Sequence, residues 1–354
     1  MNRGRLGVIA FACSIVAGGV AAQTTSMTVI ASGLNGPRGL KFGPDGNLYV
    51  AEAGTGGTNG TVGTCDQVPS PVGPYTGGKT ARISMIRPDG TRSTVVDQLP
   101  SSQDSLGDIL GVADIAFIDG QLYAALAGGG CSHGNPDIPN AVIKVDRDAG
   151  TWQQVADLSQ FVMHHPAAHI QPADFEPDET FYGMIAARDT LYVVGPNHGQ
   201  VLEVKQNGHI RQLIDISATQ GHIVPTAIAA NGGTFHVGNL NTFPIMPGTS
   251  QILDISRKGE ILHAMPGFTT VVGLAYRNHR PYAVELSTEP GNPAPGAGKV
   301  VRLSDSGAIE DVATGLTLPT ALTFGPDGNP YVSNFGAAGP GSGEIVQIAL
   351  GSSE

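Results

Sequence analysis

The stretch GPDGNLYV at residues 43–50 occurs a second time, with one residue changed, as GPDGNPYV at residues 325–332. The correspondence extends toward the N-terminus, where VIASGLNGPRGLKF (29–42) matches DVATGLTLPTALTF (311–324). Such self-similarity is the sequence signature of folds that repeat one structural unit. Further copies of the unit are therefore expected between the two matching stretches.

Short apolar segments with an aromatic residue at the first or second position mark the copies of this unit. They are LYVAE (48–52), LYAAL (122–126), LYVVG (191–195), FHVGN (235–239), PYAVE (281–285) and PYVSN (330–334). A second kind of segment ends in a tight turn and recurs as ISMIRPDGT (83–91), VIKVDRDAGT (142–151), VLEVKQNGH (201–209), ILDISRKGE (252–260) and VVRLSDSGA (300–308). Alternating apolar residues beside Asp-Gly, Asn-Gly or Lys-Gly turns predict β-hairpins. Units of about 45 residues with four strands are typical of propeller blades, so we predict an all-β, six-bladed β-propeller with four antiparallel strands per blade.

The two ends of the chain predict how this ring closes. The last unit ends with EIVQIAL (344–350) and lacks a fourth strand. The segment MTVIASG (27–33) precedes the first unit and matches the fourth strand IEDVATG (309–315) of the fifth. We therefore predict that the N-terminal strand completes the last blade, which leaves no free sheet edge. An open solenoid is the alternative, and the separated fourth strand argues against it.

The N-terminus carries the pattern of a secretory leader. MNRGRLGVIAFACSIVAGGVAAQ combines two arginines, an apolar run and a series of small residues. This pattern predicts a signal peptide over residues 1–22, followed by a single propeller domain over residues 23–354. The alternative is a retained membrane anchor, although the run is short for a spanning helix. We expect a secreted or periplasmic protein with no membrane span after the leader is removed.

Composition narrows the classes of partner. The chain has 354 residues with 14% charged residues, 50 glycines, 25 prolines and a formal net charge of −11. The glycines and prolines stand in turns between apolar runs, which favours a turn-rich β protein over disorder. The negative charge argues against nucleic acid or anionic membrane surfaces as partners. We expect a monomer.

The lengths of the connections distinguish the two faces of the predicted ring. One face has short turns only. The other face receives the links between blades and the long insertions 54–80, 128–140, 159–180, 240–250 and 287–298. We call it the long-loop face. Most of the ten histidines map there, namely His133, His164, His165, His169, His198 and His222. A rigid ring with elaborated loops on one face is typical of a scaffold that carries a functional site.

Two cysteines of the predicted mature chain lie in these insertions. Cys65 belongs to the first insertion and Cys131 to the second, so neighbouring blades hold them. An exported protein meets oxidising conditions, and we therefore predict a Cys65–Cys131 disulfide. Two free thiols are the alternative.

Polar residues end four of the aromatic-containing strands. They are Glu52, Asn239, Glu285 and Asn334, and the other two blades have Leu126 and Gly195 at this position. If these ends meet at the mouth of the central channel, their oxygen atoms could bind a polar ligand or a divalent cation such as calcium or zinc. The candidate metal ligands are Glu52, Asn239 and Glu285. The alternative is a water-filled channel lined by solvated side chains.

A second polar group is expected beside this mouth. GPNHGQ (195–200) places Asn197 and His198 in a tight loop, and TQGHIVPT (219–226) brings His222 on the next link. ADFEPDETFY (173–182) adds Glu176. A histidine beside a carboxylate can act as a general base, so His198 and His222 are candidate catalytic residues, and Glu176 and Asn197 are candidate ligand-binding residues. The alternative is that these side chains only connect loops by hydrogen bonds.

The chain resembles a known family in these same stretches. DFEPDETFYGMI (174–185), GPNHGQVLEV (195–204), QGHIVPTAIA (220–229) and VGNLNTFPI (237–245) are similar to the ScyD/ScyE family of exported propellers. The resemblance covers essentially the whole mature chain, and a more distant one links it to NHL-repeat, gluconolactonase-like and streptogramin-lyase-like propellers. It implies the fold and export but no reaction. Members of the family often have Glu where this chain has Gly195, which weakens a metal site at the channel mouth.

These observations lead to three functional hypotheses. The first is an exported propeller that binds a small-molecule or envelope ligand at its long-loop face, with no assigned activity. The second is a lyase or metal-assisted hydrolase that acts on a small metabolite, which a close histidine–carboxylate pair would favour. The third is a quinone-dependent sugar dehydrogenase, which the scarcity of basic residues weakens. The sequence contains no nucleophile elbow, P-loop, zinc-protease or dinucleotide-binding motif.

Overall fold

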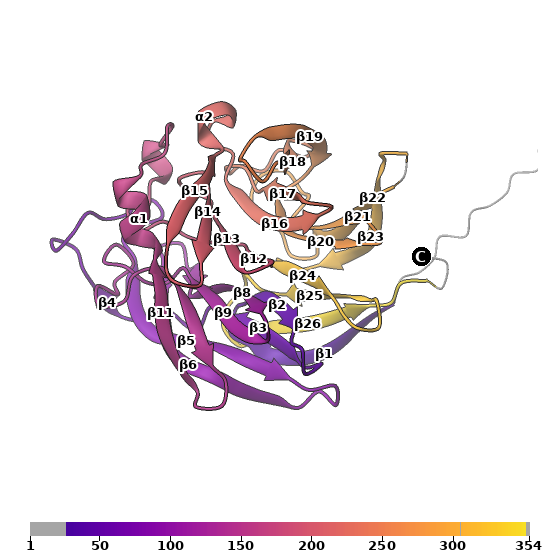
Figure 1. Cartoon of the computed structure of the whole chain (residues 1–354), viewed down its shortest axis with the longest axis horizontal. Helices are drawn as coiled ribbons and strands as arrows, with labels where there is room; N and C mark the ends of the chain where they lie inside the picture. Colours follow the sequence, from indigo (N-terminus) through magenta and orange to yellow (C-terminus); the bar gives the residue numbers. More distant parts are fainter. Residues whose placement is uncertain (1–25, 305, 352–354) are drawn as a thin grey trace, which may run out of the picture.

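The computed structural model, which describes residues 26–304 and 306–351, is a nearly all-β ring of six blades (Figure 1). The predicted signal peptide lies outside these residues. Blade 1 consists of β2 (Pro37–Phe42), β3 (Leu48–Glu52), β5 (Thr76–Ile86) and β6 (Arg92–Gln103). Blade 2 consists of β8 (Val112–Ile118), β9 (Gln121–Leu126), β10 (Ala141–Asp146) and β11 (Thr151–Asp157). Blade 3 consists of β12 (Met184–Ala187), β13 (Thr190–Gly195), β14 (Gln200–Lys205) and β15 (Ile210–Asp215).

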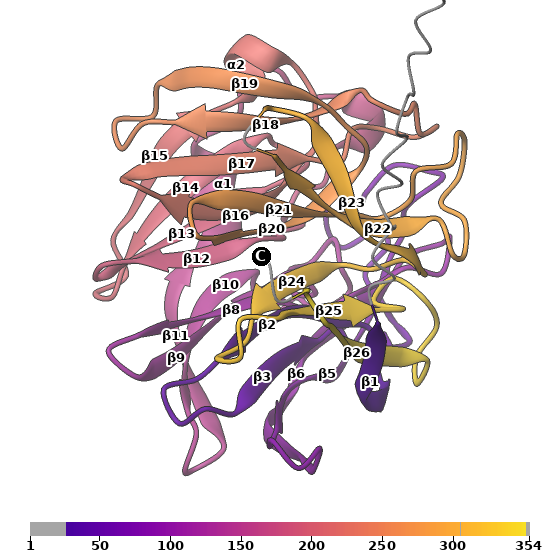
Figure 2. The same cartoon turned by 90° about the vertical axis from the view of Figure 1, so that its right-hand side faces the viewer.

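The remaining blades follow the same order. Blade 4 consists of β16 (Pro225–Asn231), β17 (Thr234–Asn239), β18 (Ser250–Ile255) and β19 (Ile261–Phe268). Blade 5 consists of β20 (Val271–Arg277), β21 (Arg280–Glu285), β22 (Gly298–Leu303) and β23 (Ile309–Leu316). Blade 6 consists of β24 (Ala321–Phe324), β25 (Pro330–Asn334), β26 (Gly343–Ile348) and β1 (Met27–Leu34). All neighbouring strands within a blade are antiparallel. In Figure 2 the first strands of the six blades surround the centre of the ring.

The N-terminal strand closes the ring as predicted. β1 pairs with β26 from Met27 opposite Ile348 to Leu34 opposite Gly343, and the strand order of the last blade is β1-β26-β25-β24. The matching sequences at the two ends of the chain therefore belong to equivalent junctions between blades. One is the junction of blade 6 with blade 1, and the other is the junction of blade 5 with blade 6.

The recurring aromatic position of the second strands joins each blade to the next. Tyr49 of β3 meets Phe117 of blade 2 edge-on with ring centroids 5.2 Å apart, and Tyr331 of β25 meets Phe42 of blade 1 at 5.0 Å. His236, which replaces the tyrosine in β17, packs on a tyrosine of blade 5 at 4.6 Å. Offset and edge-on aromatic pairs add to the stability that area burial provides. The repeated tyrosine is therefore explained by packing between blades.

The long-loop face contains regular structure that the sequence did not indicate. In blade 1 the insertion forms a ribbon, because β5 and β6 extend to 11 and 12 residues and pair with β4 (Asn59–Gly60) and β7 (Ile109–Leu110). The segment 159–180, expected as a loop, contributes to α1 (Leu158–His164) and η1 (Pro172–Asp174), and α2 (Ser217–Gln220) follows β15. α1 ends directly before His165-Pro166, where proline restricts the preceding residue to extended conformations.

The centre of the ring is nearly closed. The cavity at the centre touches the first strands of five blades and, in blade 3, Tyr182 and Gly183 just before β12. It measures about 20 Å³, which is room for about one water molecule. Tyr182 crosses the channel at the long-loop face and donates a 3.2 Å hydrogen bond to the carbonyl oxygen of Thr320 in blade 6. Deeper inside, the carboxylate of Asp114 packs against Gly39 of the neighbouring blade, where an added Cβ would come within 1.8 Å of Asp114 Oδ1. The same carboxylate accepts a 2.8 Å hydrogen bond from the backbone N–H of Met184 in blade 3. The expected open mouth is therefore covered by a tyrosine.

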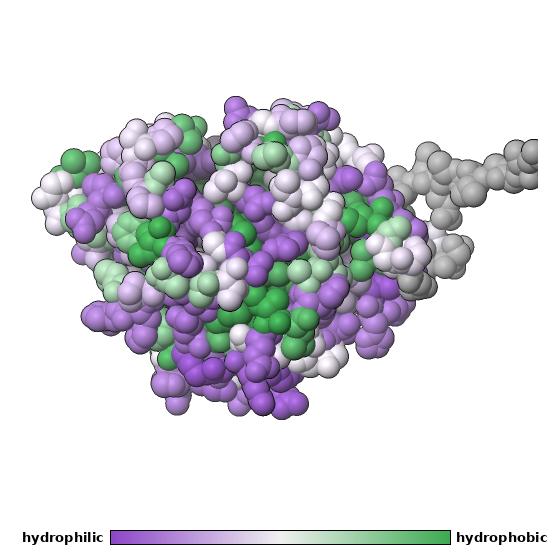
Figure 3. All heavy atoms as spheres, turned by 90° about the horizontal axis from the view of Figure 1, so that it is seen from above, coloured by the Kyte–Doolittle hydropathy of each residue, from purple (hydrophilic) through white to green (hydrophobic). Residues whose placement is uncertain are grey.

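The surface has dispersed apolar side chains. In Figure 3 hydrophobic residues form separate patches that are bordered by hydrophilic ones. Among the described residues, the large apolar side chains that are exposed are Met27, Val29, Val62, Leu106, Met163, Ile170, Phe243, Met246 and Leu262. All of them except Met27, Val29 and Leu262 belong to connections on the long-loop face. In the described part of the chain, no helix has the length and apolar character that a membrane span requires.

Candidate functional site

The polar strand ends that we predicted at the channel mouth are buried within their own blades. Glu52, at the end of β3, is fully buried, and its carboxylate accepts hydrogen bonds of 2.8 Å from both Arg82 Nε and the backbone N–H of Asn35. Ser84 Oγ donates to the same carboxylate. Arg82 on the neighbouring β5 therefore balances the charge of Glu52.

Equivalent hydrogen bonds fasten the links of blades 5 and 6. Glu285 Oε1 accepts a 2.6 Å hydrogen bond from the backbone N–H of Thr269, and Asn334 Oδ1 accepts one of 2.8 Å from that of Thr317. Burial raises the pKa of Glu285, although the Thr269 N–H and the Lys299 ammonium oppose this effect. Each polar strand end holds the link that leads into its own blade.

In blade 4 the strand-end side chain also bonds to the link before its own blade, but as the donor of the hydrogen bond. Asn239 Nδ2 donates a 2.9 Å hydrogen bond to the carbonyl oxygen of Ile223, which lies on the link before β16. Within residues 26–304 and 306–351, no group of three or more His, Cys, Asp or Glu side chains is placed to hold a metal ion. Each of the candidate metal ligands Glu52, Asn239 and Glu285 bonds to the link before its own blade. Their role as metal ligands stays a prediction. Their ligand-binding role stays a prediction, beside a structural role that the hydrogen bonds provide.

Gly195 occupies the corresponding position in blade 3, and Glu179 explains it. A Cβ at Gly195 would come within 2.7 Å of Glu179 Oε2. Glu179 comes from the link before β12 and is fully buried, with hydrogen bonds of 2.9 Å from Asn197 N and 2.8 Å from His198 N. The family resemblance leads us to expect a glutamate at the end of β13, where this chain has Gly195. In this chain Glu179, from the link before β12, occupies the space beside Gly195.

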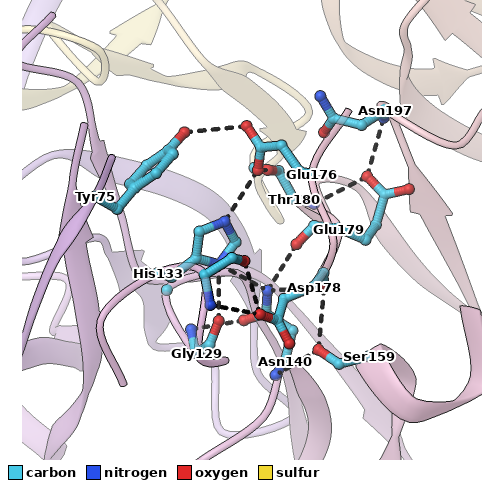
Figure 4. Close-up of polar contacts among 12 residues, drawn as sticks. Tyr75, Gly129, His133, Asn140, Ser159, Glu176, Asp178, Glu179, Thr180 and Asn197 are labelled. Carbon is cyan, nitrogen blue, oxygen red and sulfur yellow. Dashed lines mark hydrogen bonds and ion pairs between the residues drawn. The ribbon is translucent and has the colours of Figure 1, made fainter. Parts of the chain in front are cut away.

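A buried histidine–glutamate pair connects three loops of the long-loop face (Figure 4). His133 from the second insertion lies 3.0 Å from Glu176 through Nε2, and its Nδ1 lies 2.7 Å from the carbonyl oxygen of Gly129. Tyr75 from the first insertion donates a 3.1 Å hydrogen bond to Glu176, and Thr180 Oγ1 also donates to this carboxylate. Nδ1 of His133 also lies 3.3 Å from the Asn140 amide nitrogen, but the Gly129 carbonyl oxygen is closer. The nearest neighbours of both ring nitrogens are thus accepting oxygens, so the geometry favours a doubly protonated, charged ring.

The ionisation of this pair agrees with its geometry. Burial works against the charge on His133, but the hydrogen bond and the charge of Glu176 outweigh it and raise the pKa of His133 above its ordinary value. Burial likewise disfavours ionised Glu176, yet the His133, Thr180 and Tyr75 contacts lower its pKa. Burial and the Glu176 charge raise the pKa of Tyr75, so its hydroxyl remains a donor. The pair is therefore an ion pair with its hydrogen bonds satisfied.

The segment around this pair is held from several sides. Asp178 accepts hydrogen bonds of 2.8 Å from the backbone N–H and 2.7 Å from the hydroxyl of Ser132. Asn140 Nδ2 donates to the carbonyl oxygen of Glu179 at 2.7 Å, and Ser159 Oγ donates to that of Asp178 at 3.0 Å. All five residues belong to the connections of blades 2 and 3, and Ser159 lies in α1. Neighbouring links are thus fixed relative to one another.

The predicted residues Asn197, His198 and His222 meet on the same segment, and we call them the acceptor cluster. Asn197 Nδ2 donates a 3.1 Å hydrogen bond to the carbonyl oxygen of Asp174. His198 Nε2 lies 3.0 Å from the carbonyl oxygen of Glu176, and His222 Nε2 lies 2.6 Å from Asp174 Oδ2. The link before β12 therefore unites residues that are separated in the sequence.

Each member of the acceptor cluster has a second polar atom that is buried without a partner. In the described part of the chain, these atoms are Asn197 Oδ1, His198 Nδ1 and His222 Nδ1. A carbonyl or carboxylate oxygen accepts, so Nε2 of each ring carries a proton, and a ring without a second proton presents a lone pair at Nδ1. The cluster thus combines one amide oxygen and two ring nitrogens that have no partner.

Sequence reasoning placed His133 on the long-loop face but did not connect it or Tyr75 with Glu176. Tyr75 and His133 lie 101 and 43 positions from Glu176, and no local motif connects them with it. A usable signal for His133 is its position two residues after Cys131, because a disulfide-bonded loop is a fixed platform. Asp178 was visible in the same acidic stretch as Glu176, but its pairing with Ser132 depends on how the blades are placed.

The predicted disulfide is present. Cys65 and Cys131 are bonded, with Cα atoms 6.3 Å apart, and they join the first insertion to the second. Thr61 Oγ1 donates a 2.5 Å hydrogen bond to the carbonyl oxygen of Cys131, which adds a second connection beside the bond. Ser132 and His133 follow Cys131 directly, so the disulfide fixes the start of the segment that pairs with Asp178 and Glu176.

Removal of this disulfide is expected to lower stability by about 2–4 kcal/mol, because the bond restricts a long loop of the unfolded chain. The comparison is the C65S/C131S double variant against the oxidised parent in urea unfolding at equal protein concentration. A reduced parent should then match the double variant. Equal unfolding midpoints for the oxidised parent and the double variant would contradict the expectation.

Comparisons with known proteins identify the fold. Neither the family models nor the curated proteins that were compared with the sequence gave a match. The structure is similar to a Thermus thermophilus protein described as an oxidoreductase (glucose dehydrogenase), with a TM-score of 0.57, 17% identity, and 92% of this chain and 100% of that chain covered. It is also similar to a gluconolactonase from Xanthomonas campestris, with a TM-score of 0.56, 10% identity, and 92% and 90% covered. An auxiliary nutrient binding protein from Bacteroides thetaiotaomicron gives a TM-score of 0.55 at 10% identity, with 92% and 76% covered. At these identities the likeness shows the six-bladed propeller fold, and the ScyD/ScyE resemblance stays a prediction.

Proposed function

We propose that this chain is an exported propeller that binds a small-molecule or envelope ligand at its long-loop face, through the acceptor cluster of Asn197, His198 and His222. The three unpartnered polar atoms carry the proposal, in which both rings are neutral and accept through Nδ1. An unsatisfied buried polar atom costs about 1–3 kcal/mol. A ligand with hydroxyl or amine donors would remove this cost, so the cluster favours a donor-bearing ligand.

The surroundings of the cluster support binding. The buried pair of His133 and Glu176 holds the link before β12, on which the acceptor cluster meets, and the disulfide holds the first two insertions. A site on fixed loops loses little conformational entropy when a ligand binds. Exposed apolar residues such as Ile170 and Phe243 also belong to this face and could pack against the apolar part of a ligand. The disulfide supports export, since disulfides persist in oxidising compartments.

The test is the replacement of His222 by phenylalanine, which keeps a ring but removes the acceptor. A panel of polyols, monosaccharides and amines is first screened for ligands that raise the unfolding temperature of the parent. We expect His222→Phe to weaken the binding of such a ligand about tenfold, since one hydrogen bond to a buried acceptor is lost. The matched control is His169→Phe on the same face, where the side chain is exposed. Equal affinity of parent and His222→Phe would contradict the proposal.

A second candidate function, a lyase or hydrolase, is favoured by one observation. His222 and Asp174 form a close pair of 2.6 Å, and the other ring nitrogen of His222 is unpartnered. In this arrangement the carboxylate orients the ring, and Nδ1 is left to accept a proton from a substrate carbon or from water. Asp174→Asn would then lower turnover about 10²–10⁴-fold, while ligand affinity changes little. A ligand that both variants bind and that the parent leaves chemically unchanged would support binding without catalysis.

A further inference from the structure

A small cavity lies between the two insertions that the disulfide joins, apart from the acceptor cluster. Its volume is about 170 Å³. One wall is formed by Asn59 of β4 with Gly78 and Lys79 of β5, and the other wall is the loop 135–138 of blade 2. Pockets for drug-sized ligands measure about 300–1,000 Å³, so this cavity is suited to a smaller molecule.

The two walls are fixed to one another and to the propeller. Asn59 Nδ2 donates a 2.5 Å hydrogen bond to the carbonyl oxygen of Gly134, immediately before the second wall. Asn135 is buried, and its amide donates to the carbonyl oxygens of Ser101 at 3.0 Å and Gly128 at 2.7 Å. The cavity is therefore formed before any ligand arrives, which reduces the entropy cost of binding.

Opposite charges stand on opposite walls. The Lys79 side chain comes from the first wall and the Asp137 side chain from the second, and both residues are exposed. In the part of the chain that the structure describes, neither side chain has a hydrogen-bond or ion-pair partner, in contrast to Arg82 and Lys299, which pair with glutamates. A cation and an anion without protein partners are thus available to a ligand in one cavity.

Apolar groups complete the lining. Pro136 and Ile138 belong to the second wall on either side of Asp137. Gly78 leaves the first wall without a side chain, and an added Cβ there would come within 2.8 Å of the carbonyl oxygen of Gly56. A ligand with one positive group, one negative group and a short apolar portion matches these surfaces.

We infer that this cavity binds a small zwitterion of the free amino-acid type. The ligand carboxylate pairs with the Lys79 ammonium, the ligand ammonium pairs with the Asp137 carboxylate, and the ligand side chain packs on Pro136 and Ile138. A neutral sugar of similar size would leave both charges without a partner. This site is separate from the acceptor cluster, and its test does not depend on His222.

The experiment is calorimetry of the full mature chain with L-leucine, L-serine and L-glutamate, together with N-acetyl-leucine, leucinamide and glucose. We expect at least one free amino acid to bind. Blocking its amine or its carboxylate removes one charge pair and should weaken binding about fivefold, the typical worth of a partly exposed ion pair. Higher salt should weaken it too.

Variants of Lys79 and Asp137 test whether the amino acid binds between the two walls of this cavity. Lys79→Met and Asp137→Asn should each weaken the amino acid about fivefold. The matched controls are Lys258→Met and Asp148→Asn, exposed residues on the opposite face, and they should leave affinity unchanged. Absence of binding by all three amino acids at millimolar concentration would overturn the inference. So would equal binding of the blocked forms, or binding of glucose that depends on Lys79 and Asp137. His222→Phe should not alter amino-acid binding, which separates failure here from failure of the proposed function.

Discussion

Deletion of residues 27–33 is expected to lower the free energy of unfolding by about 5 kcal/mol or more, a value comparable with the total stability of many domains. These residues form most of β1, and their loss removes the ladder from Met27 opposite Ile348 to Ser32 opposite Glu344. The deletion exposes the edge of β26, which promotes aggregation. Leu34, which is fully buried, remains in the shortened chain, whereas the partly buried Ile30 and Ala31, which pack on the same hydrophobic cluster, are removed. The measured loss therefore reports strand pairing together with this packing.

A rescue variant makes this test specific. β1 is antiparallel to β26, and Met27 lies opposite Ile348. A copy of residues 27–33 attached behind the C-terminal residues can therefore form the missing strand as an ordinary hairpin. We expect it to restore the urea unfolding midpoint of the truncated chain. An unchanged midpoint after the deletion alone would show that ring closure does not depend on this strand.

The blades could be predicted from the sequence because each one repeats the same local pattern. Most copies show the second strand with its tyrosine and the following hairpin turn, and the two matching ends identified the shared blade. The ribbon of β5 and β6 could not be predicted in this way. Its close contact with blade 2, where a Cβ on Gly77 would come within 2.3 Å of Gly134 O, depends on a loop far away in the chain.

The candidate site was only partly predictable. Asn197, His198 and His222 converge because neighbouring links of a propeller lie side by side, and this follows from the fold. The roles of Glu52 and Glu285 did not follow, because a carboxylate at a strand end can face a channel or fasten its own link. The backbone donors of Asn35 and Thr269 decide between these two outcomes, and a sequence does not show them.

Replacement of Glu176 by glutamine is expected to lower the free energy of unfolding by about 3–5 kcal/mol, the usual effect of removing one partner of a buried ion pair. Three donors, from Tyr75, His133 and Thr180, converge on this carboxylate. An amide offers one acceptor oxygen and presents N–H groups on its other side, so some of these donors lose their partner. The matched control is Glu310→Gln in the exposed pair with Arg302, for which about 0–1 kcal/mol is expected.

A double-mutant cycle distinguishes the pair from the general sensitivity of a buried position. His133→Gln alone leaves the charge of Glu176 in the interior without its cation, and Glu176→Gln alone leaves His133 without its anion. The double variant removes both charges, so its destabilisation should be smaller than the sum of the two single effects by about 0.5–3 kcal/mol. Strictly additive values would show that the two side chains do not stabilise one another.

The pH dependence of the stability difference between the parent and Glu176→Gln tests whether His133 and Glu176 are both charged in the folded protein. The pKa of His133 is raised above 6.5, so its contribution is complete below that value and is lost as pH rises through the raised pKa. The pKa of Glu176 is lowered below 4.5, so its contribution is complete above that value and is lost as pH falls through the lowered pKa. The stability difference between the parent and Glu176→Gln should therefore be largest between pH 4.5 and 6.5 and should decrease on both sides. A difference that continues to grow toward alkaline pH would mean that His133 is neutral in the folded protein, and the loops would then be held by neutral hydrogen bonds alone.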